Sequence, residues 1–260
     1  MLTIAALPWL IAGGSVALAL VGVTYGLRER QRRKGRPLLD RSPVRPVSPA
    51  EVDPVFTPGP LGYSRETEAV LIGDTGATAT TSDTEAWLLS VMAKRARRIF
   101  EFGTCTGRTT YLLARNAPAA AEVVTITLSP ETIEQYQPDG DDPESARWAA
   151  IATRESAASR FFYEGTDVAA KITQILGDSK NFDETPFAGS CDLVFIDGSH
   201  AYSYVKNDTA KAFRMVRRGG AVVWHDFSPA CAGVWRYLNE LGRTVPLMHV
   251  RGTRLVVTKR

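Results

Sequence analysis

The stretch Ile99–Thr110, IFEFGTCTGRTT, decides how this chain of 260 residues is interpreted. An apolar run of strand type carries the acid Glu101 near its end and then breaks at Gly103. A second glycine, Gly107, follows before a helical pattern over 109–117. A buried strand, a glycine loop and a helix indicate one unit of an α/β fold whose loop can hold a nucleotide-like ligand.

From about residue 61, segments of strand type and helix type alternate. Short apolar runs predict strands at 98–102, 122–128, 172–176, 191–197 and 221–226. Helical periodicity predicts helices at 82–96, 109–117, 203–216 and 232–242, the third of them ended by Gly219–Gly220. Residues 245–259 resemble two strands joined by a tight turn. We therefore expect an α/β fold with a Rossmann-like, doubly wound, mostly parallel sheet and a C-terminal antiparallel hairpin strand.

The N-terminal segment has the features of a membrane anchor. Residues 2–27 contain no charged side chain and, as a helix, exceed the hydrocarbon core of about 30 Å. Trp9 and Tyr25 lie near its two ends, where amphipathic rings favour the membrane interface. A cleaved signal peptide fits less well, because no basic region precedes the apolar stretch and that stretch is too long. The sequence predicts one transmembrane helix within residues 1–27.

A basic cluster and a proline-rich stretch follow the anchor. Residues 28–36, RERQRRKGR, hold six basic side chains and one acid, which places the following chain in the cytoplasm by the positive-inside tendency. Seven prolines between residues 37 and 60 indicate a semi-extended tether. The expected division is an anchor at 1–27, a basic and then proline-rich tether at 28–60, and a catalytic domain at 61–260.

Charge and cysteine content exclude other classes of protein. The net charge of +3 comes from the basic cluster, so the remaining chain is slightly acidic and a nucleic-acid partner is not expected. The three cysteines are widely spaced and form no C-x-x-C pair, which excludes a disulfide framework and a zinc ribbon. A reducing compartment fits best.

Three kinds of glycine loop compete for the opening stretch. A phosphate-binding loop would need a longer spacing and a lysine after the second glycine. A dinucleotide loop would need glycines where the chain has Cys105 and Arg108. The third pattern, acid-x-G-x-x-x-G, puts an acid at the strand end, which suits a ligand with an ammonium and a sulfonium group and repels a pyrophosphate. S-adenosylmethionine is a ligand of this kind, but a glycine turn after a buried strand is also ordinary in α/β proteins.

Three segments, the first of which contains the opening stretch, occur in order along the chain: TSDTEAWLLSVMAKRARRIFEFGTCTGRTTYLLA, ILGDS and DLVFIDGSHAYSYVKNDTAKAFRMVRRGGAVVWHDF. On these segments, residues 80–260 resemble the class I S-adenosylmethionine-dependent methyltransferases, in particular small-molecule O-methyltransferases. The resemblance implies that the methionine part of the cofactor lies against the glycine loop and the adenine against the end of the third strand. The cofactor-binding residues that it implies are Glu101, Gly103, Thr104, Cys105, Gly107, Thr127, Asp178, Ser179 and Asp197.

The chain departs from the family pattern at the cofactor ribose. The family usually has an acid at the end of the second strand, where this chain has Thr127. Thr127 could accept one hydroxyl, or Glu131 could reach back. The long segment 129–165 should form one or two extra helices near the cofactor.

Acids and histidines follow the fourth and fifth predicted strands. Asp197 and His200 follow one strand, and His225 and Asp226 follow the other, so all four should face the carboxyl edge of the sheet. Metal-dependent relatives bind a divalent ion at these positions, which would make Asp197, His225 and Asp226 ligands of Mg²⁺ or another divalent cation. Phe227 stands where catechol-type relatives have an asparagine, which weakens that interpretation.

Without a metal, a histidine would remove the proton of the acceptor. His200 or His225 would then act as a general base, and the catalytic set would be Asp197, His200 and His225. The structural alternative is that His225 is satisfied by a backbone carbonyl and Asp226 caps the next helix.

The leading hypothesis is a membrane-anchored O-methyltransferase with its domain in the cytoplasm. A non-catalytic cofactor-binding or scaffold module is the alternative that Thr127 and Phe227 favour. A nicotinamide-dependent oxidoreductase is disfavoured by Cys105 and Arg108. The acceptor is expected to be a small or lipid-linked molecule, and a homodimer is left open.

Overall fold

The computed structural model describes residues 20–27, 42–62, 64–73, 81–142, 145–156 and 160–260. The chain divides into two units, Met1–Ser42 and Pro43–Arg260. Most of the predicted anchor lies outside the described residues, and only residues 20–27 of it are seen, as a helix. Within the described ranges, no helix combines the length and the apolar composition that a membrane crossing requires.

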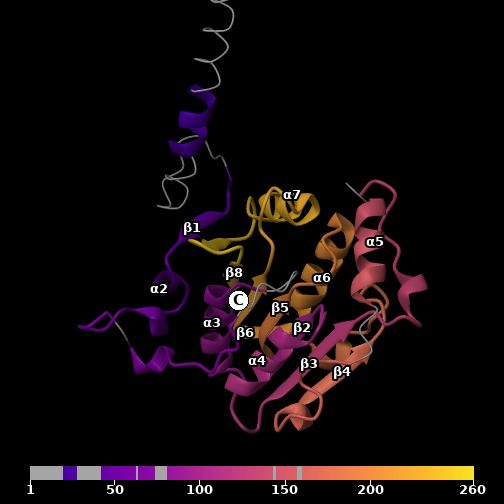
Figure 1. Ribbon diagram of the computed structural model, residues 1–260, viewed down its shortest axis with the longest axis horizontal. Coiled ribbons are helices and arrows are strands. Elements are labelled where there is room, and N and C mark those ends of the chain that lie inside the picture. The colour runs from indigo at the N-terminus through magenta and orange to yellow at the C-terminus, as the bar shows by residue number, and fades with distance from the viewer. Residues whose placement is uncertain (1–19, 28–41, 63, 74–80, 143–144, 157–159) are drawn as a thin grey trace, which may run out of the picture. The chain divides into compact units, whose positions relative to one another are not determined.

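The second unit is built on one eight-stranded sheet (Figure 1). Its strands run in the order β1-β7-β8-β6-β5-β2-β3-β4, and only β8 is antiparallel to its neighbours. The strands are β1 (Arg45–Val47), β2 (Arg98–Phe102), β3 (Glu122–Thr127), β4 (Ile172–Leu176), β5 (Cys191–Ile196), β6 (Val216–Trp224), β7 (Met248–Val250) and β8 (Val256–Lys259). The mostly parallel sheet and the C-terminal hairpin of β7 and β8 confirm the predicted fold class.

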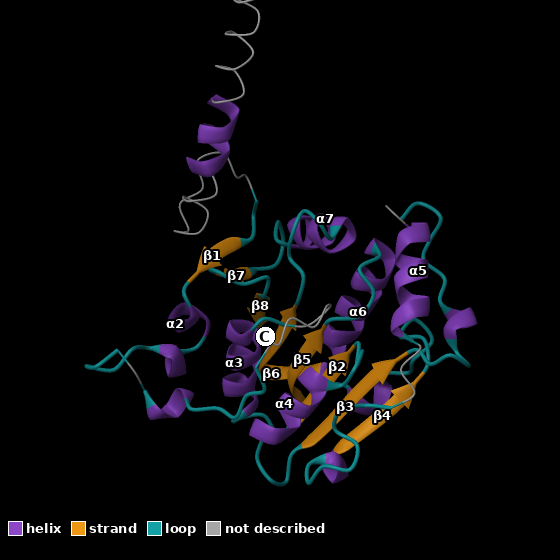
Figure 2. Ribbon diagram, in the orientation of Figure 1, coloured by secondary structure: helices purple, strands orange, loops and turns teal. Residues whose placement is uncertain are grey.

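Helices cover both faces of this sheet (Figure 2). The α-helices are α2 (Pro49–Val52), α3 (Asp83–Ala93), α4 (Arg108–Asn116), α5 (Ser145–Glu155), α6 (Tyr202–Met215) and α7 (Ala232–Leu241). Side chains of β2 alternate between the two cores: Ile99 packs with residues of α3 and α4, whereas Phe100 and Phe102 pack with residues of α6 and α7. The domain is therefore a three-layer α/β/α sandwich.

The direction of chain winding changes between two central strands. β2 pairs with β3 on one side and with β5 on the other, and all three run parallel. In open α/β sheets, ligands bind outside the carboxyl ends of the strands at such a switch point. The loops after β2 and β5 carry Gly103 and Asp197, so the fold brings two predicted site residues to this point.

Two expectations about chain segments are wrong. Residues 43–56 do not form a tether: β1 pairs in parallel with β7, and Val47 is fully buried. The hydrophobic residues between the prolines are what fold this segment onto the domain. Gly219–Gly220 does not end the third helix, because α6 stops at Met215 and the two glycines lie inside β6.

Candidate active site

The loop after β2 needs backbone conformations that most residues avoid. Gly103 has φ +97°, Cys105 +46° and Gly107 +82°, all in the left-handed region. Gly107 is the N-terminal cap of α4. A Cβ atom at Gly103 would lie 2.2 Å from the backbone oxygen of Asp197, so the two loops at the switch point touch through their backbones. Only glycine allows this approach.

We expect Gly103→Ala to weaken binding of S-adenosylhomocysteine about a hundredfold or more, because the overlap with backbone atoms of Asp197 must push the two loops apart. Isothermal titration calorimetry measures the effect. Gly165→Ala is the matched control, since Gly165 also has a left-handed φ, of +75°, but has no atom within 4 Å of an added Cβ. Equal affinities of the two variants would show that the contact with Asp197 does not matter.

Glu101 lies next to the glycine loop but is not among the residues that line the cavity described below. It is fully buried, and its Oε2 accepts hydrogen bonds from the hydroxyls of Thr110 and, at 2.8 Å, Thr125. Burial raises the pKa of Glu101 to about 8, although both hydroxyls act in the opposite direction. Because Glu101 is fully buried and its Oε2 already accepts hydrogen bonds from two hydroxyls, its carboxylate does not reach the lining of that cavity.

Glu101→Gln should make folding less sensitive to pH. The folded pKa of Glu101 is above the unfolded value of 4.5, so the wild-type protein loses stability as pH rises from about 4.5 through about 8. Glutamine stays neutral, and we expect the variant to gain on the order of 3 kcal/mol relative to wild type between pH 5 and pH 9.5. Urea unfolding at both pH values measures this difference. Parallel pH curves for the wild-type protein and the variant would contradict it.

One cavity of about 730 Å³, including its open mouth, lies at the switch point. Six of the nine predicted cofactor residues line it: Gly103, Cys105, Thr127, Asp178, Ser179 and Asp197. The other three, Glu101, Thr104 and Gly107, lie outside the lining. The hydroxyl of Thr104 bonds to that of Thr125 at 2.7 Å, and Gly107 faces the ring of Tyr163. The structure therefore brings six of the nine predicted residues together around one cavity.

The end of the cavity near β4 is aromatic and polar. Asp178 accepts a hydrogen bond from the hydroxyl of Tyr204 at 2.8 Å. The Tyr204 ring stacks on Tyr136 with 4.6 Å between centroids, and both tyrosines line the cavity. Thr127 lines the cavity as expected, whereas Glu131 is exposed and does not. Sequence reasoning missed both tyrosines, because Tyr136 lies in an insertion without a motif and Tyr204 is one apolar position among others in the helical pattern of α6.

Helix α5, within the long segment 129–165, forms a further wall. Its residues Trp148, Ile151, Ala152 and Glu155 line the cavity at helical spacing. Figure 1 shows α5 beside α6, on the side of the sheet towards which β3 and β4 point. An extra helix near the cofactor site was predicted, but the sequence did not single out its inward residues.

His225 is held between carboxylates. Its Nδ1 lies 2.9 Å from Oδ1 of Asp197 and 3.5 Å from Oδ2 of Asp226, and its Nε2 lies 3.3 Å from Oε2 of Glu85. Glu85 comes from the first turn of α3, where it also forms a capping box with Ser82. Burial disfavours a charged imidazole, but these carboxylates raise the pKa of His225 well above its usual value. His225 is therefore an imidazolium at neutral pH.

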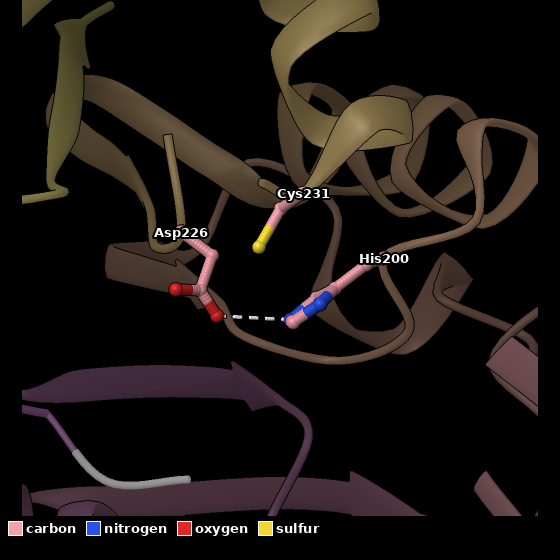
Figure 3. Close-up of side chains that lie close together, drawn as sticks. All are labelled: His200, Asp226 and Cys231. Atoms are coloured by element: carbon pink, nitrogen blue, oxygen red, sulfur yellow. Dashed lines mark ion pairs between the residues drawn. The ribbon is translucent and has the colours of Figure 1, made fainter. Parts of the chain in front are cut away.

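His200 forms a second pair with Asp226 (Figure 3). Its Nε2 lies 2.9 Å from Oδ2 of Asp226, and the thiol of Cys231 lies in the same cluster. Burial opposes the charged ring, but the bond to Asp226 prevails and raises the pKa of His200 to about 10. His200 lines the cavity, whereas His225 does not. Of the two predicted histidines, His200 is therefore the one that a ligand can touch.

The charges of this cluster balance. Three carboxylates, Glu85, Asp197 and Asp226, face three cationic groups, His200, His225 and Arg254, with Arg254 lying 3.0 Å from Asp226. Asp226 has a left-handed φ of +56°, which aims its carboxylate at both histidines. Both histidines hold the carboxyl pKa of Asp226 below its ordinary value, although burial acts against them.

The predicted metal ligands lie close enough to share an ion. One carboxylate oxygen each of Asp197 and Asp226 and one ring nitrogen of His225 lie within 4.8 Å of one another. Glu85 behind Nε2 of His225 is the kind of partner that orients a metal-bound imidazole. A metal would have to displace the proton of His225, so it competes with the ion pairs described above. Phe227 takes no part, because it is buried and stacks on Trp235.

The fold and the cavity define an α/β enzyme domain for a small ligand at the switch point of a doubly wound sheet. Residues 100–227 match the family model of a methyltransferase domain. This region, just under half of the chain, is therefore similar to the class I S-adenosylmethionine-dependent methyltransferases. The match runs from β2 to the residues just after β6, and so contains the glycine loop and both histidines of the cluster.

The similarity of this chain to solved structures is weaker than its match to the family model. Cofactor-bound Rv0187 from MTB is 20% identical, with a TM-score of 0.46 over 82% of this chain and 97% of that chain. The O-methyltransferase TomG from Streptomyces achromogenes, in complex with SAM, is 21% identical, with a TM-score of 0.45 over 69% and 80%. Such scores carry no argument about the chemistry of this chain. No curated protein matches it.

Proposed function

We propose that this protein transfers a methyl group from S-adenosylmethionine to a hydroxyl oxygen of an acceptor. The observation that carries the proposal is that His200, paired with Asp226, lines the same cavity as Gly103 and Cys105 of the glycine loop of a methyltransferase domain. A histidine oriented by a carboxylate is an arrangement that manages the proton of an attacking oxygen.

The charge of the cavity supports this cofactor. Four lining residues are acidic, Glu155, Asp178, Asp197 and Asp208, and the only basic one among the lining residues that the structure describes is His200. An acidic cavity attracts the ammonium and sulfonium groups of S-adenosylmethionine and repels the pyrophosphate of a dinucleotide. The backbone at Gly103, which has no Cβ, gives the methionine part room to approach.

The reaction needs a proton to leave the acceptor. Bound S-adenosylmethionine supplies an electrophilic methyl carbon, and its sulfur retains the electron pair of the broken bond. His200, whose pKa of about 10 keeps it charged at pH 7, must first release its ring proton to solvent. The neutral ring then accepts the proton of the acceptor hydroxyl as that oxygen bonds to the methyl carbon. The ring of His200 then lies against the attacking oxygen, and Asp226 keeps that ring oriented.

A divalent ion is the second mechanism, favoured by the three potential ligands Asp197, His225 and Asp226 with Glu85 behind them. Mg²⁺ or Mn²⁺ there would acidify the acceptor hydroxyl directly. Chelator treatment separates the two mechanisms. Activity that disappears with chelator and returns with Mg²⁺ supports the ion, whereas full activity in chelator rules it out.

We expect His200→Gln to lower the rate of methyl transfer about 10²- to 10⁴-fold, because the proton of the acceptor then has no histidine to accept or balance it. Single-turnover transfer from labelled S-adenosylmethionine to a panel of hydroxyl acceptors measures this rate. His249→Gln, on β7 and outside the cavity, is the control and should keep the wild-type rate. Equal rates for both variants would remove His200 from the mechanism.

Binding without transfer would favour the alternative of a scaffold module. Thr127 on the cavity wall is the observation behind that alternative, since a threonine offers the ribose one hydrogen bond where an acid would offer two. Calorimetry that detects S-adenosylmethionine binding, combined with no transfer to any acceptor, would support it.

We also propose that residues 2–27 anchor the protein in a membrane with the domain on the cytoplasmic side, on the grounds of their length, their lack of charge and the basic residues that follow. A small or lipid-linked acceptor at the membrane surface fits this arrangement. A reporter fused to the C-terminus that is active only outside the cytoplasm would overturn the orientation.

A further inference from the structure

The inward face of α5 carries one charge. Trp148, Ile151 and Ala152 present apolar side chains to the cavity, and Glu155, one turn further on, presents a carboxylate. The Glu155 side chain is 38% exposed, so it is partly withdrawn from water. A carboxylate at the end of an otherwise apolar lining face needs a cationic partner, because burying part of an unpaired charge costs free energy.

Glu155 lies at the glycine-loop end of the cavity rather than at the end near Asp178. Its carboxylate interacts electrostatically with His200, Asp197 and Cys105. All three line the cavity beside the loop after β2. In the family that this domain resembles, the glycine loop is where the methionine part of the cofactor is expected.

The protein itself gives Glu155 only a weak counter-charge. Among the residues that the structure describes, its ion-pair partner is Arg154, whose nitrogen is 3.8 Å away and whose side chain is 73% exposed. An exposed pair at this distance contributes little. Burial raises the pKa of Glu155, and the charges of His200 and Arg154 offset that effect only in part.

The other carboxylates at this end are already engaged. Asp197 is paired with His225 at 2.9 Å. Glu101 is fully buried under the loop, accepts two threonine hydroxyls and lies outside the cavity lining. Glu155 is the carboxylate that both lines this end of the cavity and lacks a close cation of its own.

We propose that Glu155 binds the ammonium group of the methionine part of S-adenosylmethionine. The inference rests on the proposed function, because it presumes this cofactor. It assigns to the insertion helix α5 the contact that the strand-end acid Glu101 was expected to make, and it makes α5 a part of cofactor recognition.

The test compares two ligands that differ at the amino-acid end. S-adenosylhomocysteine carries the ammonium group, whereas 5′-methylthioadenosine has the same adenosine and sulfur but no amino-acid part. For the full-length protein, we expect Glu155→Gln to weaken S-adenosylhomocysteine binding about tenfold to a hundredfold, the effect of losing one charge-assisted hydrogen bond. The affinity for 5′-methylthioadenosine should stay within about twofold of wild type.

Glu134→Gln is the matched control, because Glu134 is an exposed glutamate of the same insertion that does not line this cavity. It should change neither affinity. The proposal is overturned if Glu155→Gln leaves S-adenosylhomocysteine binding unchanged, or if it weakens both ligands equally, which would mean that the residue acts on the position of α5. A wild-type protein that binds neither ligand overturns the proposed function itself, and the proposal with it.

Discussion

A fragment of residues 43–260 is expected to fold, whereas a fragment of residues 61–260 is expected to be largely unfolded. The shorter fragment lacks β1 and the five buried side chains Val44, Val47, Val52, Val55 and Phe56. Each contributes about 1.5–3 kcal/mol by burial, so their summed loss is comparable to the whole stability of a typical domain.

Removal of residues 43–60 also exposes what they cover. β7 would lose its parallel neighbour β1, and the edge of Trp87 would lose the ring of Phe56, whose centroid lies 5.3 Å away. Circular dichroism during heating measures the outcome for both fragments. Equal melting temperatures would show that residues 43–60 are a dispensable tether, as the prolines alone suggest.

Glu85→Ala should be the most damaging single substitution in the charged cluster. Glu85 is 4% exposed and accepts hydrogen bonds from the backbone of Ser82 at 2.8 Å and of Arg254 at 2.6 Å, in addition to its pair with His225. Its loss leaves a buried imidazolium with fewer counter-charges and uncaps α3. We expect the free energy of unfolding to fall by about 3–5 kcal/mol at pH 7.

The pH dependence of this effect has a defined sign. Burial would raise the carboxyl pKa of Glu85, but His225 and the backbone donors lower it to about 2, below its unfolded value of 4.5. Its contribution is therefore present above pH 4.5 and is lost as pH falls towards 2. Urea unfolding at pH 7 and at low pH measures the difference from wild type, which should shrink in acid.

Glu66→Ala is the control for Glu85→Ala. Glu66 pairs with Arg95 at 3.3 Å, but both side chains are about two-thirds exposed. Exposed pairs contribute about 0–1 kcal/mol, so this variant should unfold almost as wild type does. A similar decrease in the free energy of unfolding in both variants would show that burial does not increase the contribution of the Glu85–His225 pair to stability.

The loop after β2 was predictable because its signal is local. Gly103 and Gly107 have left-handed backbone conformations, which a sequence reveals through glycine itself. The parallel register of β2 with β5 then brings Asp197 to the same edge. Strand type and order around this point follow from short apolar runs with helices between them.

The direction of the Glu101 side chain follows from the strand pattern only once the helices are placed. Alternation along β2 puts Glu101 on the face of Ile99, which α4 covers, and so beneath the hydroxyl of Thr110. The sequence identifies an acid at a strand end, but its direction depends on which face each helix occupies.

Other contacts in the site join residues that are far apart in the sequence. Glu85 reads as an ordinary capping-box residue of α3, and nothing local indicates that it meets His225, which is 140 residues later in the chain. The same holds for Arg254, which reaches Asp226 from the turn between β7 and β8. Such contacts exist only after the sheet has formed.

The contact between Trp148 and His200 gives the cavity an optical reporter. The indole of Trp148 meets the His200 ring edge-on, with 4.6 Å between centroids, and it is the tryptophan of the described part that lines the cavity. A charged imidazole quenches indole emission by accepting an electron from the excited ring. Occupation of the cavity and neutralisation of His200 would therefore both change the fluorescence of the unlabelled protein, and subtraction of the Trp148→Phe signal isolates this one indole from the others.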